Sequence, residues 1–311
     1  MTPAARLAAA AALLDEIGAG MPAEKALTRW GRGARYAGSG DRAAVRDLVF
    51  DVLRTRRSCA ARGGGATGRA LVLGLLRGRG DDPAAWFTGT RHALPPLAAG
   101  EAAAGRAPEG WEALDMPDWL APALRESLGT ATEAVCRALR HRAPVFLRWH
   151  ERRTDAGTVM AALAEDGIVA APHPLAPTAL VVTEGARRLR QARVYREGLV
   201  ELQDAASQAV CAALPARPGL RVLDYCAGGG GKALALAARG AEVIAHDADP
   251  ARMADLPVRA ARAGDPVRVA TSGEVAALGP YALVLADVPC SGSGAWRRQA
   301  EAKWRLTREG L

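Results

Sequence analysis

The chain has 311 residues, of which 50% are hydrophobic and 24% charged, and its formal net charge is +8. This composition excludes an intrinsically disordered protein, because such chains lack the apolar residues that build a core. The positive charge favours a polyanionic partner such as nucleic acid. Lysine stands only at positions 25, 232 and 303, so 38 of the 41 basic residues are arginine, and the codon bias of a GC-rich genome contributes to this charge.

The cysteine pattern and the apolar segments indicate the cellular compartment to expect. The five cysteines are Cys59, Cys136, Cys211, Cys226 and Cys290; they form no CxxC pair, and no His/Cys cluster has the spacing of a zinc site. An odd number of cysteines suits a reducing cytoplasm. The apolar run Leu7–Leu14 is too short to span a membrane. We expect a cytoplasmic protein with neither a metal site nor a membrane partner.

Residues 1–130 have the apolar periodicity of helices. In "GSGDRAAVRDLVFDVLRTRRS", Ser39 or Asp41 is expected to cap a helix. Its apolar face carries Val45, Leu48, Val49, Val52 and Leu53. Its other face and its exit carry Arg42, Arg46, Arg54, Arg56 and Arg57. Two interpretations fit these arginines, a solvated face and a face that contacts RNA.

Residues 131–203 predict a small α/β unit. "VFLRWH", "TALVVT" and "GLVELQ" are typical of short strands, and "TDAGTVMAALAEDG" of a capped helix that ends at Gly167. Asp204 is then expected to cap the helix "AASQAVCAAL".

From residue 219 strands alternate with helices, which indicates a parallel sheet built from βαβ units. The expected strands are "LRVLDY", "AEVIAHD", "VRVAT" and "YALVLADV", and the helix in "DPARMADLPVRAARAG" is expected to be interrupted at Pro257. Right-handed crossovers bring the loops after these strands to one edge of the sheet, where ligands bind.

The loop "CAGGGGK" after the first of these strands predicts a nucleotide-type site, because glycines let the backbone approach a ligand closely. A phosphate-binding P-loop does not fit, since Cys226 replaces the first glycine and Ala233 follows the lysine. A dinucleotide site fits formally through Gly228, Gly230 and Ala233, with Asp247 19 residues after Gly228. S-adenosylmethionine would use the same geometry, and the loop alone leaves both open.

The stretch "DVPCSGSG" after the fourth strand separates these alternatives. A dehydrogenase has no evident use for Asp287 and Cys290 at this place, whereas a cytosine methyltransferase does. Carbon 5 of cytosine becomes nucleophilic only after a thiolate adds to carbon 6, and a second group must then remove the proton from carbon 5. Ser291–Gly294 permits close approach to a base.

Four motifs in order resemble the RNA cytosine-5 methyltransferases of the RsmB/NOP/Sun family. They are "GLVELQDAASQAV", "LDYCAGGGGKALALAA", "VIAHDADPARM" and "DVPCSGSGAWRRQAEAKWRL", and the resemblance covers residues 145–311. The helical part is similar to the NusB-like RNA-binding domain of the ribosomal-RNA members. The resemblance implies an all-α NusB-like domain at 1–130, a small α/β RRM-like subdomain at 131–203 and, at 204–311, the N-terminal half of a Rossmann-like class I methyltransferase domain.

The resemblance also implies the roles of particular residues. The methionine end of S-adenosylmethionine would be held by Cys226, Ala227, Gly228, Gly229, Gly230, Gly231 and Lys232, and its ribose by Asp247. Asp287 would lie beside the cofactor and the target base, and Asp224 would help to hold the glycine loop. Arg297, Arg298 and Lys303 would lie near RNA.

The sequence departs from the family pattern at several positions. Gly229 and Ala300 stand where the family usually has proline. At the adenine-side contact, Ser272-Gly273 with Glu274 next replaces the usual Gly-Asp. In the family the Pro-Cys cysteine, here Cys290, assists product release, whereas in DNA cytosine methyltransferases the Pro-Cys cysteine is itself the nucleophile, which is the alternative for Cys290. The attacking cysteine belongs to a Thr-Cys-Ser motif that is not in this chain. The strand in "YALVLADV" would leave an apolar edge, so we expect 311 residues to be part of a longer protein.

Three functions therefore remain for comparison. The first is methylation of carbon 5 of a cytosine in RNA, with ribosomal RNA favoured and transfer RNA as the alternative class. The second is a non-catalytic RNA-binding factor that lacks the nucleophile. The third is a nicotinamide-dependent oxidoreductase.

Overall fold

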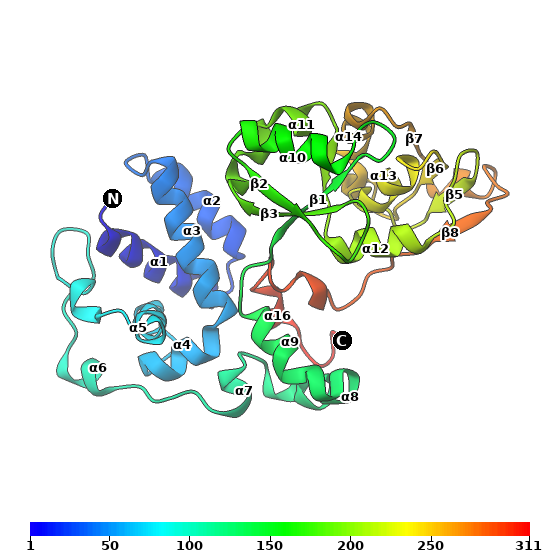
Figure 1. Ribbon diagram of the computed structural model, residues 1–311. Coiled ribbons are helices and arrows are strands. Elements are labelled where there is room, and N and C mark those ends of the chain that lie inside the picture. Colours follow the sequence, from blue (N-terminus) through cyan, green and yellow to red (C-terminus); the bar gives the residue numbers. More distant parts are fainter. The chain divides into compact units, whose positions relative to one another are not determined.

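The computed structural model describes residues 1–311, and the chain divides into two compact units, Met1–Ala143 with Cys290–Leu311, and Pro144–Pro289. Figure 1 shows the helices of the first unit in blue to green, with the C-terminal segment in red. None of the helices combines the length and the apolar character of a membrane span. No group of three or more His, Cys, Asp or Glu side chains is arranged to hold a metal ion.

The first unit is helical. Its helices are α1 (Pro3–Gly18), α2 (Ala23–Gly33), α3 (Ser39–Arg54), α4 (Arg56–Gly63), α5 (Gly68–Arg79), α6 (Ala99–Ala103), α7 (Gly110–Ala113), α8 (Ala121–Leu128), α9 (Thr132–Leu139) and α16 (Ala302–Arg305). Helices α1, α3 and α5 supply most of one buried apolar cluster, which also contains Ala300. The helical character expected for this region is confirmed.

Helix α3 starts differently from the expectation. Its N-cap is Gly38, and Ser39 is already the first helical residue. The Asp41 carboxylate accepts hydrogen bonds from the Gly38 N–H, from Arg6 Nε and from the N-terminal amine. Asp41 therefore stabilises the first turn from inside the helix, and neither predicted residue is the cap.

The arginines of α3 and its exit are largely paired within the protein. Arg54 is only 5% exposed and donates from Nε to the carbonyl of Arg297. Arg57 forms two hydrogen bonds of 2.8 Å with the Asp118 carboxylate, and Arg46 pairs with Glu24. A solvated or RNA-contacting face is thus wrong for Arg54, whose guanidinium lies in the interior.

The second unit contains two sheets. Its strands are β1 (Val145–Trp149), β2 (Val169–Pro172), β3 (Ala179–Glu184), β4 (Val200–Leu202), β5 (Arg221–Asp224), β6 (Glu242–Ala245), β7 (Val267–Val269) and β8 (Leu283–Leu285). Its helices are α10 (Ala156–Glu165), α11 (Arg193–Arg196), α12 (Ala205–Ala213), α13 (Gly231–Ala237), α14 (Leu256–Ala263) and α15 (Ser272–Val275).

The first sheet is antiparallel, in the order β2-β3-β1-β4. Successive residues of β1 face opposite sides: Leu147 packs with Leu163 of α10, and Phe146 with Ala205 of α12. Accordingly, α10 and α12 cover opposite faces of this sheet (Figure 1). The Asp155 carboxylate caps α10 by accepting from the Thr158 N–H, and the Asp204 carboxylate caps α12 by accepting from the Ala206 N–H. A capped first helix and the Asp204 cap were both expected.

The second sheet is parallel, in the order β7-β6-β5-β8. From β5 the chain runs outward through β6 and β7 and then returns to the other side of β5. The carboxyl ends of β5 and β8 therefore flank the point where the strand order reverses, which is where open α/β sheets bind ligands. Strand β8 lies at the edge of the sheet, and its Val284 is 55% exposed. This confirms the expected edge.

The break near Pro257 lies earlier than expected. A short 3-10 turn, Pro250–Met253, precedes α14, and Pro257 is the second residue of that helix. Proline is tolerated in the first turn because the N–H groups there have no partner inside the helix. Pro257 therefore stands within the start of α14 and does not interrupt it.

Candidate cofactor site

The glycine loop connects β5 to α13 at the reversal point. Gly228 and Gly230 have φ values of +51° and +75°, which side chains rarely adopt. A Cβ atom at Gly230 would also lie 2.3 Å from Leu256 of α14. These two positions explain why the loop needs glycine, and they set the backbone that leads into the first turn of α13.

Asp247 ties the end of β6 to this loop. Its carboxylate accepts hydrogen bonds from the N–H groups of Gly228 at 2.9 Å and Asp249 at 3.0 Å, and it pairs with Arg252 at 3.1 Å. Burial acts to raise the pKa of Asp247, but the two N–H donors and Arg252 hold that pKa below its usual value. Asp247 is therefore an anion fixed beside the loop.

A cavity of about 100 Å³ opens between the ends of β5 and β8. Its lining consists of Gln203, Ser207, Asp224, Cys226, Ala227, Gly231, Lys232 and Asp287. The structure thus brings Asp224, Lys232, Asp287 and part of the glycine loop into one cavity. Gly228, Gly229, Gly230 and Asp247 lie outside this lining.

Asp224 is the most unusual group in the cavity. Both carboxylate oxygens are buried, and apart from the Ala233 N–H, which acts to lower the pKa of Asp224, no donor of the protein faces them at hydrogen-bond geometry. Burial raises the pKa of Asp224 to about 6, although the Lys232 ammonium acts in the opposite direction. A buried acceptor without a donor is costly, so this side chain fits a ligand that brings a positively charged or N–H donor group.

Lys232 and Asp287 form an ion pair across the cavity, with Nζ 2.5 Å from Oδ2. Lys232 comes from the first turn of α13, and Asp287 follows β8 and is 57% exposed. A partly exposed pair of this kind opens at low cost. Both side chains can therefore exchange their contact for one with a ligand.

Several residues that support the glycine loop were not predicted by the sequence analysis. Arg148 of β1 donates to Gln203 Oε1 at 2.7 Å and to the Gly231 carbonyl at 3.2 Å, and Gln203 Nε2 donates to the same carbonyl at 3.1 Å. Arg259 of α14 donates to the Gly229 carbonyl. The available signal was the charged Arg148 inside the apolar stretch "VFLRWH", which is typical of a paired, buried cation.

Other predicted site residues lie in the C-terminal segment of the first unit. Cys290 is exposed. Arg297 donates to the carbonyls of His141 and Arg142, and Arg298 is exposed. Glu274, in the second unit, is occupied in the first turn of α15, where it accepts from the N–H and hydroxyl of Thr271.

Lys303 does not fit the expected contact with RNA. It is 1% exposed, and its Nζ donates to the Arg54 carbonyl at 3.3 Å. Burial lowers the pKa of Lys303 to about 8, which nearby Asp115 partly offsets. An ammonium held in the interior cannot reach a phosphate, so the structure corrects the role assigned to Lys303.

Comparison with known families shows which family these motifs belong to. The family description "16S rRNA methyltransferase RsmB/F" matches residues 211–311, and "Methyltr_RsmF/B-like, ferredoxin-like domain" matches residues 116–187. The chain belongs to the RsmB/NOP/Sun family. Its expected fold class is confirmed too, with a helical N-terminal region, a ferredoxin-like sheet and a methyltransferase-type parallel sheet.

Curated members of the RsmB/NOP/Sun family match this chain in part. "Ribosomal RNA small subunit methyltransferase B" of Xanthomonas campestris is 34% identical over 201 residues, which is 62% of this chain and 45% of that protein. The protein of the same name from Citrobacter koseri is 30% identical over 195 residues, 60% of this chain and 45% of that protein. The chain thus spans about half the length of the curated relatives it matches.

Solved structures support the same fold. The crystal structure of PH0851 aligns over 99% of this chain and 79% of its own, with a TM-score of 0.72 and 20% identity. A methyltransferase homolog protein from Pyrococcus horikoshii aligns over 58% of this chain and 63% of its own, with a TM-score of 0.52 and 21% identity.

Proposed function

We propose that this protein takes part in S-adenosylmethionine-dependent methylation of carbon 5 of a cytosine in RNA. Ribosomal RNA is the favoured substrate class, and transfer RNA is the alternative. The observation that carries the proposal is Asp224, a buried carboxylate in the cavity between β5 and β8 that no side-chain donor satisfies. A positively charged amino group such as that of methionine would satisfy it. The names of the family and of the curated relatives support methyl transfer to ribosomal RNA.

In this proposal the cofactor supplies the methyl group, and the residues of the chain hold and orient it. The loop Cys226–Lys232 would surround the methionine end, with Asp224 accepting from its amino group. Asp247 would accept from the ribose hydroxyls with lone pairs that Gly228 and Asp249 leave free, since a carboxylate offers about four acceptor sites. Asp287 would release Lys232 and face the cofactor and the base.

The chemistry on cytosine gives Cys290 a defined role. A thiolate adds to carbon 6, which forms a C–S bond and moves the electron pair of the 5,6 double bond to carbon 5. Carbon 5 then takes the methyl group. A base removes the carbon 5 proton, the double bond forms again, and the C–S electron pair leaves with sulfur. By the family resemblance, Cys290 assists this release, and the attacking thiol belongs to the Thr-Cys-Ser motif.

Two measurements test the proposal. Calorimetric titration of the chain with S-adenosylmethionine should give binding that Asp224→Asn and Asp247→Ala weaken. NAD binding without S-adenosylmethionine binding would instead favour the oxidoreductase. Transfer of a radiolabelled methyl group by the complete gene product to unmodified ribosomal RNA should exceed transfer to transfer RNA. No transfer to either RNA would leave only the non-catalytic RNA-binding factor.

A further inference from the structure

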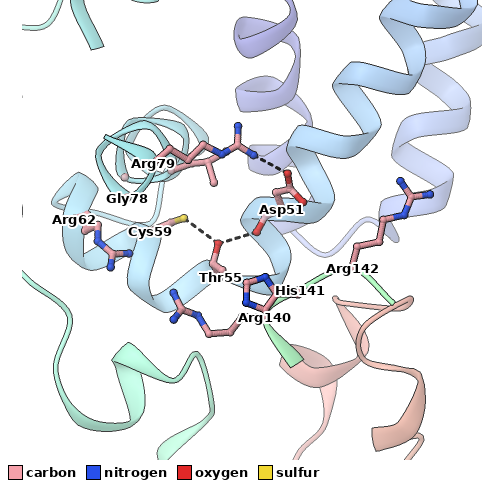
Figure 2. A pocket seen from close by; sticks show the side chains of 11 residues that line it. Asp51, Thr55, Cys59, Arg62, Gly78, Arg79, Arg140, His141 and Arg142 are labelled. Carbon is pink, nitrogen blue, oxygen red and sulfur yellow. Dashed lines mark hydrogen bonds and ion pairs between the residues drawn. The ribbon is translucent and has the colours of Figure 1, made fainter. Parts of the chain in front are cut away.

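The first unit contains a cavity of about 340 Å³ beside α3, α4, α5 and the segment that follows α9 (Figure 2). Its lining consists of Asp51, Thr55, Cys59, Arg62, Gly74, Leu75, Gly78, Arg79, Arg140, His141 and Arg142. This volume lies within the range of small-molecule sites, roughly 300–1,000 Å³. The cavity is separate from the candidate cofactor site, which lies in the other unit.

The close packing of α4 on α5 builds the wall of this cavity. A Cβ atom at Gly74 would lie 1.8 Å from the Cys59 carbonyl oxygen, so the two backbones touch there. One turn later, the space above Gly78 is filled by the Arg62 guanidinium, with Nη1 3.3 Å from the place of a Cβ atom. The glycines of α5 thus give Arg62 its position at the cavity.

The lining is strongly basic, with four arginines and one carboxylate. Three of these arginines form ion pairs with acidic side chains. Arg79 pairs with Asp51 at 2.6 Å, Arg140 with Asp115 at 2.9 Å, and Arg142 with Asp47 at 3.4 Å. The half-buried Arg62 guanidinium forms no hydrogen bond or ion pair with the protein. The excess positive charge of the cavity therefore resides at Arg62.

A second cavity, of about 1050 Å³, shares Arg62 and Arg140 with the first. Its lining also includes two further arginines, Arg125 and Arg137, and the aromatic side chain of Trp111. Arg125 already lies over the Trp111 ring at 4.9 Å, and Arg137 pairs with Glu133. The ring is thus covered by a cation, so the junction at Arg62 and Arg140 is better suited to an anion than to a stacked base.

We infer that Arg62, at the junction of the two cavities that Arg140 also lines, binds a backbone phosphate of a single RNA strand that runs through the two joined cavities. This inference rests on RNA as the substrate of the proposed function. A guanidinium fork matches phosphate oxygens in a bidentate way. A concave groove lined by several arginines fits a polyanion whose phosphates are regularly spaced along its backbone. A single strand is narrow enough to enter such a groove, whereas a duplex is not.

Fluorescence anisotropy with a labelled single-stranded RNA tests the site in the whole chain. Arg62→Ala should weaken binding about tenfold and lower the salt dependence by about one released counterion. Arg62→Lys should keep part of the affinity. Arg91→Ala removes an exposed arginine of the same unit outside both cavities and serves as the matched control. Equal affinity of Arg62→Ala and Arg91→Ala would overturn the inference.

Two further measurements separate a loss of RNA binding from misfolding and from binding of another ligand. Thermal unfolding of Arg62→Ala should match wild type; if the variant does not fold, Arg62→Gln replaces it. Titration with inorganic phosphate and with an acidic peptide distinguishes other ligands. Arg62-dependent binding of either one, with no Arg62 effect on RNA, would overturn the assignment to RNA. Because binding requires no methyl transfer, the two tests can fail separately: Arg62-dependent RNA binding together with no methyl transfer by the complete gene product would refute the proposed function alone.

Discussion

Gly228 and Asp247 are 19 residues apart in the chain, and a hydrogen bond of 2.9 Å joins the Gly228 N–H to the Asp247 carboxylate. The bond links the loop after β5 to the end of the neighbouring strand β6. The acid therefore orders the glycine loop before any ligand arrives, and its effect on binding includes this preorganisation.

We expect Asp247→Ala to lower the affinity for S-adenosylmethionine by about tenfold or more, because the Gly228 N–H loses its acceptor. Asp249→Ala is the matched control, since Asp249 caps the 3-10 turn through the Ala251 N–H and does not touch the loop. Calorimetric titration measures both variants. Unchanged affinity in Asp247→Ala would remove this residue from the site.

Asp224 should make stability depend on pH. Its pKa is about 6 in the folded protein against a usual 3.8, because burial disfavours its charge. The folded state binds the proton more tightly than the unfolded state does, so the free energy of unfolding falls as pH rises from about 4 to about 6. Above that range the full penalty, up to about 3 kcal/mol, is present.

Asp224→Asn removes this penalty and should stabilise the protein at pH 7.5 while abolishing the cofactor contact. Denaturant unfolding at pH 4.5 and pH 7.5 measures the change in the free energy of unfolding. Asp204→Asn, at the exposed N-cap of α12, is the control. An identical pH dependence in wild type and Asp224→Asn would show that Asp224 is not the titrating group.

The two glycines of α5 should respond differently to alanine. Gly74→Ala places a Cβ atom 1.8 Å from the Cys59 carbonyl, so α4 and α5 must separate at a cost of about 2 kcal/mol or more. Gly78→Ala meets only the flexible end of Arg62 at 3.3 Å and gains up to about 1 kcal/mol of helix propensity. Denaturant unfolding compares them, and equal destabilisation would contradict the close helix contact.

Lys303 should contribute a second, alkaline dependence on pH. Its pKa is about 8 when folded against a usual 10.5, mainly because of burial. The unfolded chain binds more protons between these values, so the free energy of unfolding should rise as pH increases from 8 to 10. Lys303→Met should flatten this rise in thermal unfolding. An unaltered slope would mean that the ammonium is solvated.

Cys290→Ala in the complete protein should trap an RNA adduct, because release of the methylated base is slowed while attack continues. The adduct would be seen as a slower-migrating, RNA-dependent band under denaturing conditions. Cys211→Ala, a change at a buried cysteine of α12, is the control. A fully active Cys290→Ala enzyme without any adduct would refute the release role.

The second unit was largely predictable from its sequence. Alternating strands and helices, the glycine loop and Asp204 each carry a local signal, and the structure has all of them. Strand β2 was missed because "VAAP" is short, mostly exposed and ends in proline, so it lacks the period of a strand. Its pairing with β3 depends on the tertiary fold.

The errors arose where distant parts of the chain meet. The family resemblance implies that Lys303 lies near RNA, but its partner is the Arg54 carbonyl, 249 residues away. Arg54 itself is buried against the Arg297 carbonyl, 243 residues away. Neither partner is visible in a local pattern, so neither contact could be predicted from the sequence.

The buried guanidinium of Arg148 also limits how this protein could be re-engineered. Arg148 belongs to the ferredoxin-like sheet, yet its acceptors are the Gly231 carbonyl at the start of α13 and Gln203 between the two sheets. The small sheet is therefore not an interchangeable module. A chimera that exchanges it for a foreign sheet would lose this support of the Gly231 carbonyl unless an arginine were grafted at the same position.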